Sequence, residues 1–174
     1  MKVGIKSEFQ KEHTELVIKR TFDVPRELLY AAWTSREHLE QWWGPKGFEM
    51  HVIRYDLRSD GIFLYKQRSP EGMEMWGKFQ FQEIDAPKKL VFVSSFSNSV
   101  GQTVRAPFSA SWPLEIQNTL TFLEQDSTTN LIIRGTPLNG TEEENQTFET
   151  AKEQIKQGFN GTLDQLESYL DDIL

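Results

Sequence analysis

The chain of 174 residues contains no cysteine, so it can form no disulfide bond, no thiolate metal site and no cysteine nucleophile. Its first dozen residues are mostly polar and lack the apolar core of a signal peptide. No stretch approaches the roughly 18 uninterrupted apolar residues of a membrane span. Together these absences predict a cytoplasmic protein without a membrane span.

Clusters of basic residues are also missing. The formal net charge is −7, and no run of lysine and arginine is interleaved with aromatic residues. Because binding to a phosphate backbone needs a cationic surface, no nucleic-acid partner is expected.

Motifs for metal, phosphate or nucleophilic chemistry are absent as well. The histidines His13, His38 and His51 are far apart and show no metal-ligand spacing such as HxxxH. There is no GxSxG nucleophile elbow and no glycine-rich phosphate loop. The sequence therefore predicts no metal and no cofactor, and it predicts an exposed or incidental position for each histidine.

Aromatic residues, in contrast, are abundant, with five Trp and twelve Phe. In a chain of this length, such a number is typical of one large packed core. The alternative interpretation is a core that is opened to hold an aromatic or lipid-like guest.

The stretch from Thr141 to Leu174 has the clearest periodic pattern, because its apolar residues recur at spacings of three and four and so form one helical stripe. Thr141 is the predicted N-cap, and the three glutamates after it suit the positive end of the helix dipole. Gly158 and Gly161 interrupt the interior at a cost of roughly 1 kcal/mol each. They predict either a tight contact or cavity beside them, or simply a tolerated bend. The stripe consists of Phe148, Ala151, Ile155, Phe159, Leu163, Leu166, Leu170 and Ile173.

A strand, two short helices and a run of strands precede this helix. Alternation predicts the first strand from Thr14 to Phe22, after which Pro25 begins one short helix and Ser35 caps a second. Turn-rich separators between the later strands indicate antiparallel neighbours. These later strands are predicted at Phe48–Leu57, Ile62–Gln67, Met75–Ile84, Lys89–Phe96, Glu115–Glu124 and Asn130–Pro137.

One long connection separates two of these strands. It runs from Ser97 to Pro113 and holds Phe108 and Trp112 among small and polar residues. Connections of this length are usually functional, so we expect a partly ordered flap, and we use that name for residues 97–113.

The predicted architecture is α+β. An antiparallel sheet of about seven strands has one apolar face to cover, and the long C-terminal helix has the matching stripe. We therefore expect a curved sheet that grips this helix, with two short helices after the first strand. No linker divides the chain, which predicts a single domain over residues 14–174 after an N-terminal extension over residues 1–13.

The segment Thr21 to Phe48, TFDVPRELLYAAWTSREHLEQWWGPKGF, resembles the opening signature of the family related to the C-terminal domain of the activator of the ninety-kilodalton heat-shock protein ATPase. With the later blocks, the resemblance covers about residues 14–172. It implies the START-like (SRPBCC, Bet v-like) helix-grip fold of lipid-transfer domains, polyketide cyclases and plant ligand-binding allergens. A cavity between sheet and helix is also implied, which holds apolar ligands in some members and supports catalysis in a minority. The later blocks are Asp56-Leu57-Arg58 with Gly61, Trp112-Pro113-Leu114-Glu115 with Asn118-Thr119, Gln157-Gly158-Phe159, and Leu163-Asp164-Gln165-Leu166 with Tyr169-Leu170.

Aromatic residues on alternate strand positions are the candidate cavity contacts, with a well-packed core as the alternative. Alternation puts Phe79 and Phe81 on one strand face and Trp76 on the other, so these two sets are not expected to line one pocket. Trp42 and Trp43 cannot both point inward, so one should pack while the other lies at a rim. The candidate ligand-binding residues are Trp43, Phe63, Tyr65, Phe79, Phe81, Phe92, Phe96, Phe108, Trp112, Arg134, Phe148, Ile155 and Phe159.

Few polar residues are candidates for chemistry. Glu74, between two methionines, is the best acid or base, with a solvated turn position as the alternative. Asp56 and Arg58 indicate a structural ion pair. Arg134 either anchors a ligand in the cavity or lies on the wet face of its strand.

Three functional hypotheses remain open. The first is binding of a small lipophilic or aromatic molecule in the cavity. The second, implied by the resemblance, is a chaperone-associated interaction protein of the stress response. The third is a cyclase-like enzyme, which needs at least two convergent polar groups in the pocket. A monomer and a homodimer are both compatible with the sequence.

Overall fold

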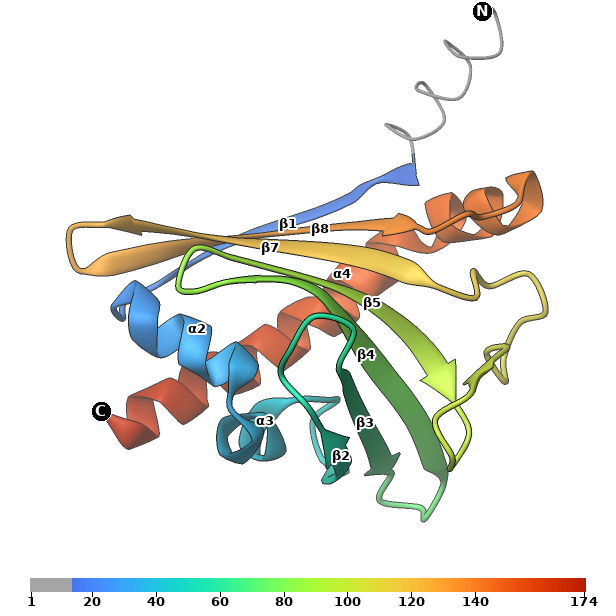
Figure 1. Ribbon diagram of the computed structural model, residues 1–174, viewed down its shortest axis with the longest axis horizontal. Helices are drawn as coiled ribbons and strands as arrows, with labels where there is room; N and C mark the ends of the chain where they lie inside the picture. The colour runs from blue at the N-terminus through green and yellow to red at the C-terminus, as the bar shows by residue number, and fades with distance from the viewer. Residues whose placement is uncertain (1–13) are drawn as a thin grey trace, which may run out of the picture.

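A computed structural model describes residues 14–174, so the predicted extension over residues 1–13 lies outside the described residues. One antiparallel sheet curves around a long C-terminal helix, which runs diagonally across it (Figure 1). The strands are β1 (Leu16–Phe22), β2 (Glu49–Tyr55), β3 (Ile62–Arg68), β4 (Glu74–Asp85), β5 (Lys89–Ser97), β6 (Thr103–Val104), β7 (Ile116–Gln125) and β8 (Thr128–Pro137). The helices are α2 (Arg26–Thr34), α3 (Arg36–Trp42) and α4 (Glu142–Ile173).

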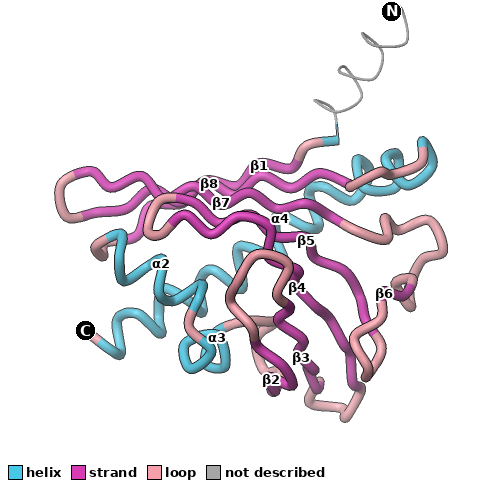
Figure 2. The backbone as a smooth tube through the Cα atoms, in the orientation of Figure 1, coloured by secondary structure: helices cyan, strands magenta, loops and turns pink. Residues whose placement is uncertain are grey.

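The order of the strands across the sheet is β1-β8-β7-β5-β4-β3-β2, and all pairs are antiparallel. The predicted α+β fold and all the predicted strands and helices are confirmed, with ends that differ by no more than two residues. Only β6 was missed. It consists of two residues that pair with β5 inside the flap (Figure 2), and it is too short to show a period.

Helices α2 and α3 close one end of the curved sheet (Figure 1). Trp33 and Trp42 are buried, and the Trp42 Nε1–H donates to the Ala32 carbonyl over 2.9 Å. Ser35 is the N-cap residue of α3, as predicted, but its side chain makes no capping hydrogen bond to the backbone, because its hydroxyl donates to the Glu37 carboxylate over 3.0 Å.

Helix α4 begins with a reciprocal capping box. The Thr141 hydroxyl accepts from the Glu144 backbone N–H over 3.1 Å, and the Glu144 carboxylate accepts from the Thr141 N–H over 2.8 Å. Most of the predicted stripe faces the sheet, but Ile173 is 43% exposed because it lies in the last turn, beyond the core. In the C-terminal half of α4, Arg20 of β1 forms salt bridges with Asp164 at 2.5 Å and with Glu167 at 3.0 Å, which link the helix to the sheet.

Gly158 and Gly161 do not mark a tight contact. A methyl group added at either position would meet no atom within 4 Å, and both residues are exposed. The prediction of a tight contact is wrong. The space beside both glycines is an open hollow on the outer side of α4, bordered also by Gln41 and Pro45, and is separate from the space between α4 and the sheet.

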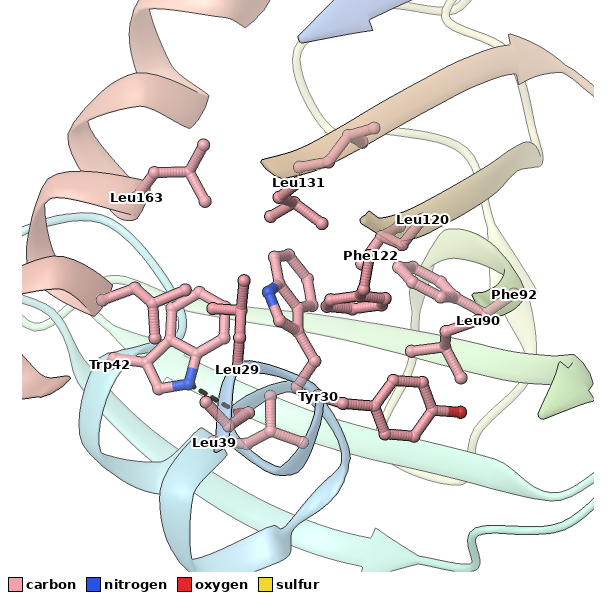
Figure 3. Close-up of a cluster of buried hydrophobic side chains, with 14 of the residues drawn as sticks. Leu29, Tyr30, Leu39, Trp42, Leu90, Phe92, Leu120, Phe122, Leu131 and Leu163 are labelled. Atoms are coloured by element: carbon pink, nitrogen blue, oxygen red, sulfur yellow. Dashed lines mark hydrogen bonds between the residues drawn. The ribbon is translucent and has the colours of Figure 1, made fainter. Parts of the chain in front are cut away.

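The hydrophobic core fills the half of the sheet next to α2 and α3. Figure 3 shows Leu163 of α4, Leu131 of β8 and Trp42 converging with Leu120 and Phe122 of β7 in one cluster. Burial of each such side chain stabilises the fold by roughly 1.5–3 kcal/mol. Among residues 14–174, no helix is long and apolar enough to cross a membrane.

Candidate functional site

The other half of the sheet leaves a pocket of about 210 Å³ under α4. Strands β3, β4, β5 and β7 form its floor, and Phe159 of α4 borders it from the helix side. Trp43, directly after α3, and Trp112 of the flap complete the wall. The lining residues are Trp43, Tyr65, Gln67, Met75, Trp76, Gly77, Phe79, Phe92, Ser94, Ser95, Phe96, Trp112, Pro113, Ile116, Asn118 and Phe159.

Aromatic rings make up half of this lining and hold one another in place. Phe79 and Phe92 stack across β4 and β5 with centroids 4.0 Å apart and an interplanar angle of 16°. The Trp43 ring meets Phe79 edge-on at 5.1 Å and Phe159 at 6.0 Å. Because aromatic pairs favour such stacked and edge-on arrangements, the wall is a fixed apolar surface.

Tyr65 contributes a hydroxyl to the pocket. The residue paired with it across the strands is Gly77, and a methyl group at Gly77 would lie only 2.5 Å from the Tyr65 hydroxyl oxygen. The glycine therefore provides the space in which the phenol lies. Burial raises the pKa of Tyr65 to about 12, and the adjacent Trp43 N–H has a smaller, lowering effect without hydrogen-bond geometry. The phenol is consequently protonated at neutral pH.

Gln67 follows two positions along β3, on the same face as Tyr65. It is only 9% exposed, and its carboxamide makes no hydrogen bond to another residue of the described chain. The amide lies against Gly44, whose φ of +111° favours glycine and where a side chain would collide with Gln67. The Gly44 carbonyl accepts from Gln165 of α4 over 2.6 Å, so this loop is held in position.

The polar residues on the opposite side of the pocket satisfy one another. The Asn118 side chain donates to the Ser94 hydroxyl over 2.9 Å and to the Ile116 carbonyl over 3.1 Å. The donors of both side chains are therefore used within the protein, since the Ser94 hydroxyl also donates to the Ile116 carbonyl over 3.5 Å.

The flap lies at the mouth of the pocket, at the same end of the molecule as the start of α4 (Figure 1). Phe108 is 63% exposed and packs edge-on against both Phe96 and Trp112, with centroid distances of 5.6 Å. Arg105 donates to the Trp112 carbonyl over 3.1 Å and pairs with Glu144 of α4. These contacts tie the flap to the N-terminal end of α4.

Seven of the thirteen predicted cavity residues border this pocket, and six do not. Those at the pocket are Trp43, Tyr65, Phe79, Phe92, Phe96, Trp112 and Phe159. Phe63, Phe81 and Phe148 are buried in the core, Ile155 packs beside it, and Phe108 lies outside on the mouth. The placement of Arg134 in the cavity is wrong, because its position on β8 faces outward, where it pairs with Glu15 at 2.7 Å.

Two predictions about the directions of tryptophan side chains have different outcomes. Trp42 is buried and Trp43 half-buried at the pocket, as expected of neighbouring tryptophans. Trp76, expected to be separate from the pocket that Phe79 lines, also borders it. Near its start β4 runs along the pocket, so consecutive residues contribute to the lining there.

The polar candidates lie outside the pocket. Glu74 is exposed and pairs with Lys66 at 2.9 Å, and this lysine lowers the pKa of the carboxyl group instead of leaving it raised. Asp56 and Arg58 form the predicted ion pair, at 2.5 Å. His38 is not incidental, because its Nδ1 lies 2.5 Å from the Tyr169 hydroxyl and links α3 to α4.

Sequence reasoning missed Gln67, Ser94 and Asn118. Each shares a strand face with an aromatic or aliphatic pocket residue two positions away, namely Tyr65, Phe92 and Ile116. The same period-two alternation that selected the aromatic residues could have found these polar ones.

Charged groups are absent from the pocket lining, which holds no Asp, Glu, His, Lys or Arg. Within residues 14–174, no three His, Asp or Glu side chains are grouped so that they could hold a metal ion. The geometry can therefore enclose a neutral apolar molecule and offer it a few neutral hydrogen-bonding groups.

Comparisons with known proteins show which family and which solved structures the chain resembles. The family model described as Activator of Hsp90 ATPase homolog 1-like protein matches residues 23–171. One similar solved structure is a protein of Arthrobacter aurescens, with 24% identity, coverage of 92% of this chain and 88% of that chain, and a TM-score of 0.77. A second is a protein of Staphylococcus epidermidis, with 26% identity, coverage of 92% of each chain, and a TM-score of 0.73. A third is the AHSA1 protein of Silicibacter pomeroyi, with 19% identity, coverage of 92% of this chain and 99% of that chain, and a TM-score of 0.70. These similarities extend over nearly the whole described chain and concern its fold. No curated protein matches the chain.

Proposed function

The chain belongs to the family of Activator of Hsp90 ATPase homolog 1-like proteins, and on that premise we propose that it binds a small, uncharged, mainly aromatic or lipophilic molecule between its sheet and α4. The observation that carries this proposal is the pocket itself, with its aromatic lining and its volume of about 210 Å³.

The volume limits the size of the ligand. An apolar cavity of roughly 150 Å³ is large enough for benzene, whereas pockets for drug-sized molecules occupy about 300–1,000 Å³. A pocket of about 210 Å³ accordingly favours a molecule of one or two rings, or an aliphatic chain of similar volume.

The lining limits the charge of the ligand. Because no charged side chain borders the pocket, an ionised ligand would lose its hydration without gaining an ion pair. A neutral ligand is therefore favoured.

The same lining favours binding over acid–base catalysis. Tyr65 is the one titratable side chain that borders the pocket, and its pKa of about 12 is far from the neutral range where an acid or base works well. The polar groups that a cyclase-like enzyme would need are present only as neutral hydrogen-bonding side chains.

Fluorescence titration with a panel of neutral one- and two-ring aromatics, naphthalene among them, tests the proposal. Saturable binding is expected, and it should be lost in Ser94→Leu, which fills the pocket beside Phe79. Thr119→Leu, which adds the same side chain on the opposite face of the sheet, should bind as the parent does. The absence of saturable binding to any of the panel would contradict the proposal.

The family description supports a second candidate, a chaperone-associated role in the stress response of the cytoplasm. Added protein should then raise the rate of ATP hydrolysis by a chaperone of the Hsp90 class several-fold. If Ser94→Leu stimulates as well as the parent, an outer surface of the protein is responsible; if neither stimulates, this role is excluded.

A further inference from the structure

The side of the pocket next to β3 contains three neutral polar groups without hydrogen-bond partners. They are the Tyr65 hydroxyl, the Gln67 carboxamide and the Trp43 indole N–H. Of the three, only the Trp43 N–H is fully buried without a partner. The Tyr65 hydroxyl and the Gln67 carboxamide make no hydrogen bond to the described residues and remain accessible from the pocket. An N–H buried without a partner is unfavourable, and the two accessible groups beside it are free to bind a partner from outside the chain.

The backbone around these groups keeps them in place. Tyr65 lies over Gly77, and Gln67 lies against Gly44, so each side chain occupies space that a neighbouring glycine leaves free. Gly77 carries no side chain inside its strand, where glycine is otherwise unfavourable. The Tyr65 and Gln67 positions are thus prepared before any ligand arrives, which reduces the entropy lost on binding.

From this arrangement we infer the chemical class of the ligand: a neutral aromatic or lipophilic alcohol or phenol whose hydroxyl group lies between Tyr65 and Gln67. The inference rests on the proposed binding function and deepens it. A hydroxyl can donate to one group and accept from another at the same time. It can donate to the Gln67 carbonyl oxygen and accept from the protonated Tyr65 hydroxyl.

The polar pair on the other side of the pocket has no free N–H donor for this hydroxyl. Asn118 already donates to Ser94 and to the Ile116 carbonyl. The recognition of a ligand hydroxyl is accordingly assigned to β3, and the rest of the pocket holds the apolar body.

Three ligands of almost equal shape separate the alternatives in calorimetric titrations at neutral pH: naphthalene, 2-naphthol and 2-methoxynaphthalene. Naphthol should bind about tenfold more tightly than naphthalene, as expected for two neutral hydrogen bonds. The methyl ether accepts but cannot donate, so it should lose most of this advantage.

Two variants locate the effect. Tyr65→Phe and Gln67→Met should each reduce the ratio of naphthol affinity to naphthalene affinity, measured in the same variant, by about threefold or more. Thr119→Ala, on the opposite face of the sheet, is the control and should preserve the advantage.

The outcomes distinguish this inference from the proposed function. If naphthalene and naphthol bind equally, or if the methyl ether equals naphthol, the inference about the hydroxyl is overturned while the binding function stands. If the advantage of naphthol persists in both Tyr65→Phe and Gln67→Met, its assignment to β3 is overturned. If none of the three ligands binds, the proposed function fails as well.

Discussion

At the scale of single residues, Glu144 connects more of the structure than its place in a first helical turn would indicate. Its carboxylate closes the capping box with Thr141 and also pairs with Arg105 of the flap. The backbone hydrogen bond from Thr141 and the contact with Arg105 lower the pKa of this carboxyl group. One buried carboxylate thus joins the start of α4 to the flap at the pocket mouth.

This lowered pKa makes the contribution of Glu144 depend on pH. Because the folded state favours the ionised form, the contribution is complete above the unfolded pKa of about 4.3 and is lost as pH falls through the lower folded value. Glu144→Gln should therefore cost on the order of 1 kcal/mol at pH 7 and less at acid pH. Urea unfolding of parent and variant at both pH values measures the difference.

Glu143→Gln is the matched control, since it removes an exposed charge from the same helical turn. Its effect should be limited to the helix-dipole contribution, a few tenths of a kcal/mol. If the two variants lose equal stability at neutral pH, the pairing of Glu144 with Arg105 contributes nothing to the free energy of unfolding.

At the scale of elements, α4 is stabilised by its buried stripe rather than by its helical propensity. Its outer side tolerates two glycines three positions apart, next to open space. The contacts of Phe148, Leu163, Leu166 and Leu170 with the sheet compensate for them.

Alanine at either glycine should consequently stabilise the protein. Gly158→Ala and Gly161→Ala are each expected to add roughly 0.5–1 kcal/mol to the free energy of unfolding, because the methyl group meets no atom and the unfolded chain loses freedom. Gly77→Ala should instead destabilise, since it collides with Tyr65. Thermal unfolding of the three variants is the measurement, and a loss of stability in both helix variants would contradict this account of α4.

The flap is a second element whose behaviour follows from a few contacts. Arg105 is the main link from the flap to Trp112 and to α4. In Arg105→Met, hydrogen exchange of the amides of residues 103–113 should become several-fold faster, with little change in β7 and β8. Lys152→Met, which removes a cation farther along α4, should leave the exchange of the flap unchanged. Equal exchange in Arg105→Met and the parent would show that other contacts hold the flap.

The elements themselves could be predicted from the sequence because each has a local cause. Alternation gave the strands, the stripe gave α4, and Thr141 with Glu144 marked its first turn. The side-chain partner of Ser35 and the existence of strand β6 could not be predicted in the same way. The Ser35 hydroxyl has a nearer carboxylate to bind, and β6 exists only because the flap folds back along β5.

At the scale of the whole molecule, the site depends on where the curved sheet and α4 separate. Side chains on one face of a strand do not all have the same surroundings. Phe63 of β3 is buried in the core, whereas Tyr65 and Gln67, on the same face of β3, border the pocket. Curvature and strand register decide this division, and both depend on contacts between residues far apart in the sequence. The sequence therefore indicated that the site is aromatic more reliably than it indicated which residues line it.

The five tryptophans allow the most direct test of the claim that a ligand lies between the sheet and α4. Three of them, Trp43, Trp76 and Trp112, border the pocket, while Trp33 and Trp42 lie in the core beneath α2 and α3. In ¹H–¹⁵N spectra, saturating 2-naphthol should shift the indole N–H signals of the first three strongly and those of the other two much less. Strong shifts confined to Trp33 and Trp42, or no saturable shift at all, would contradict the claim.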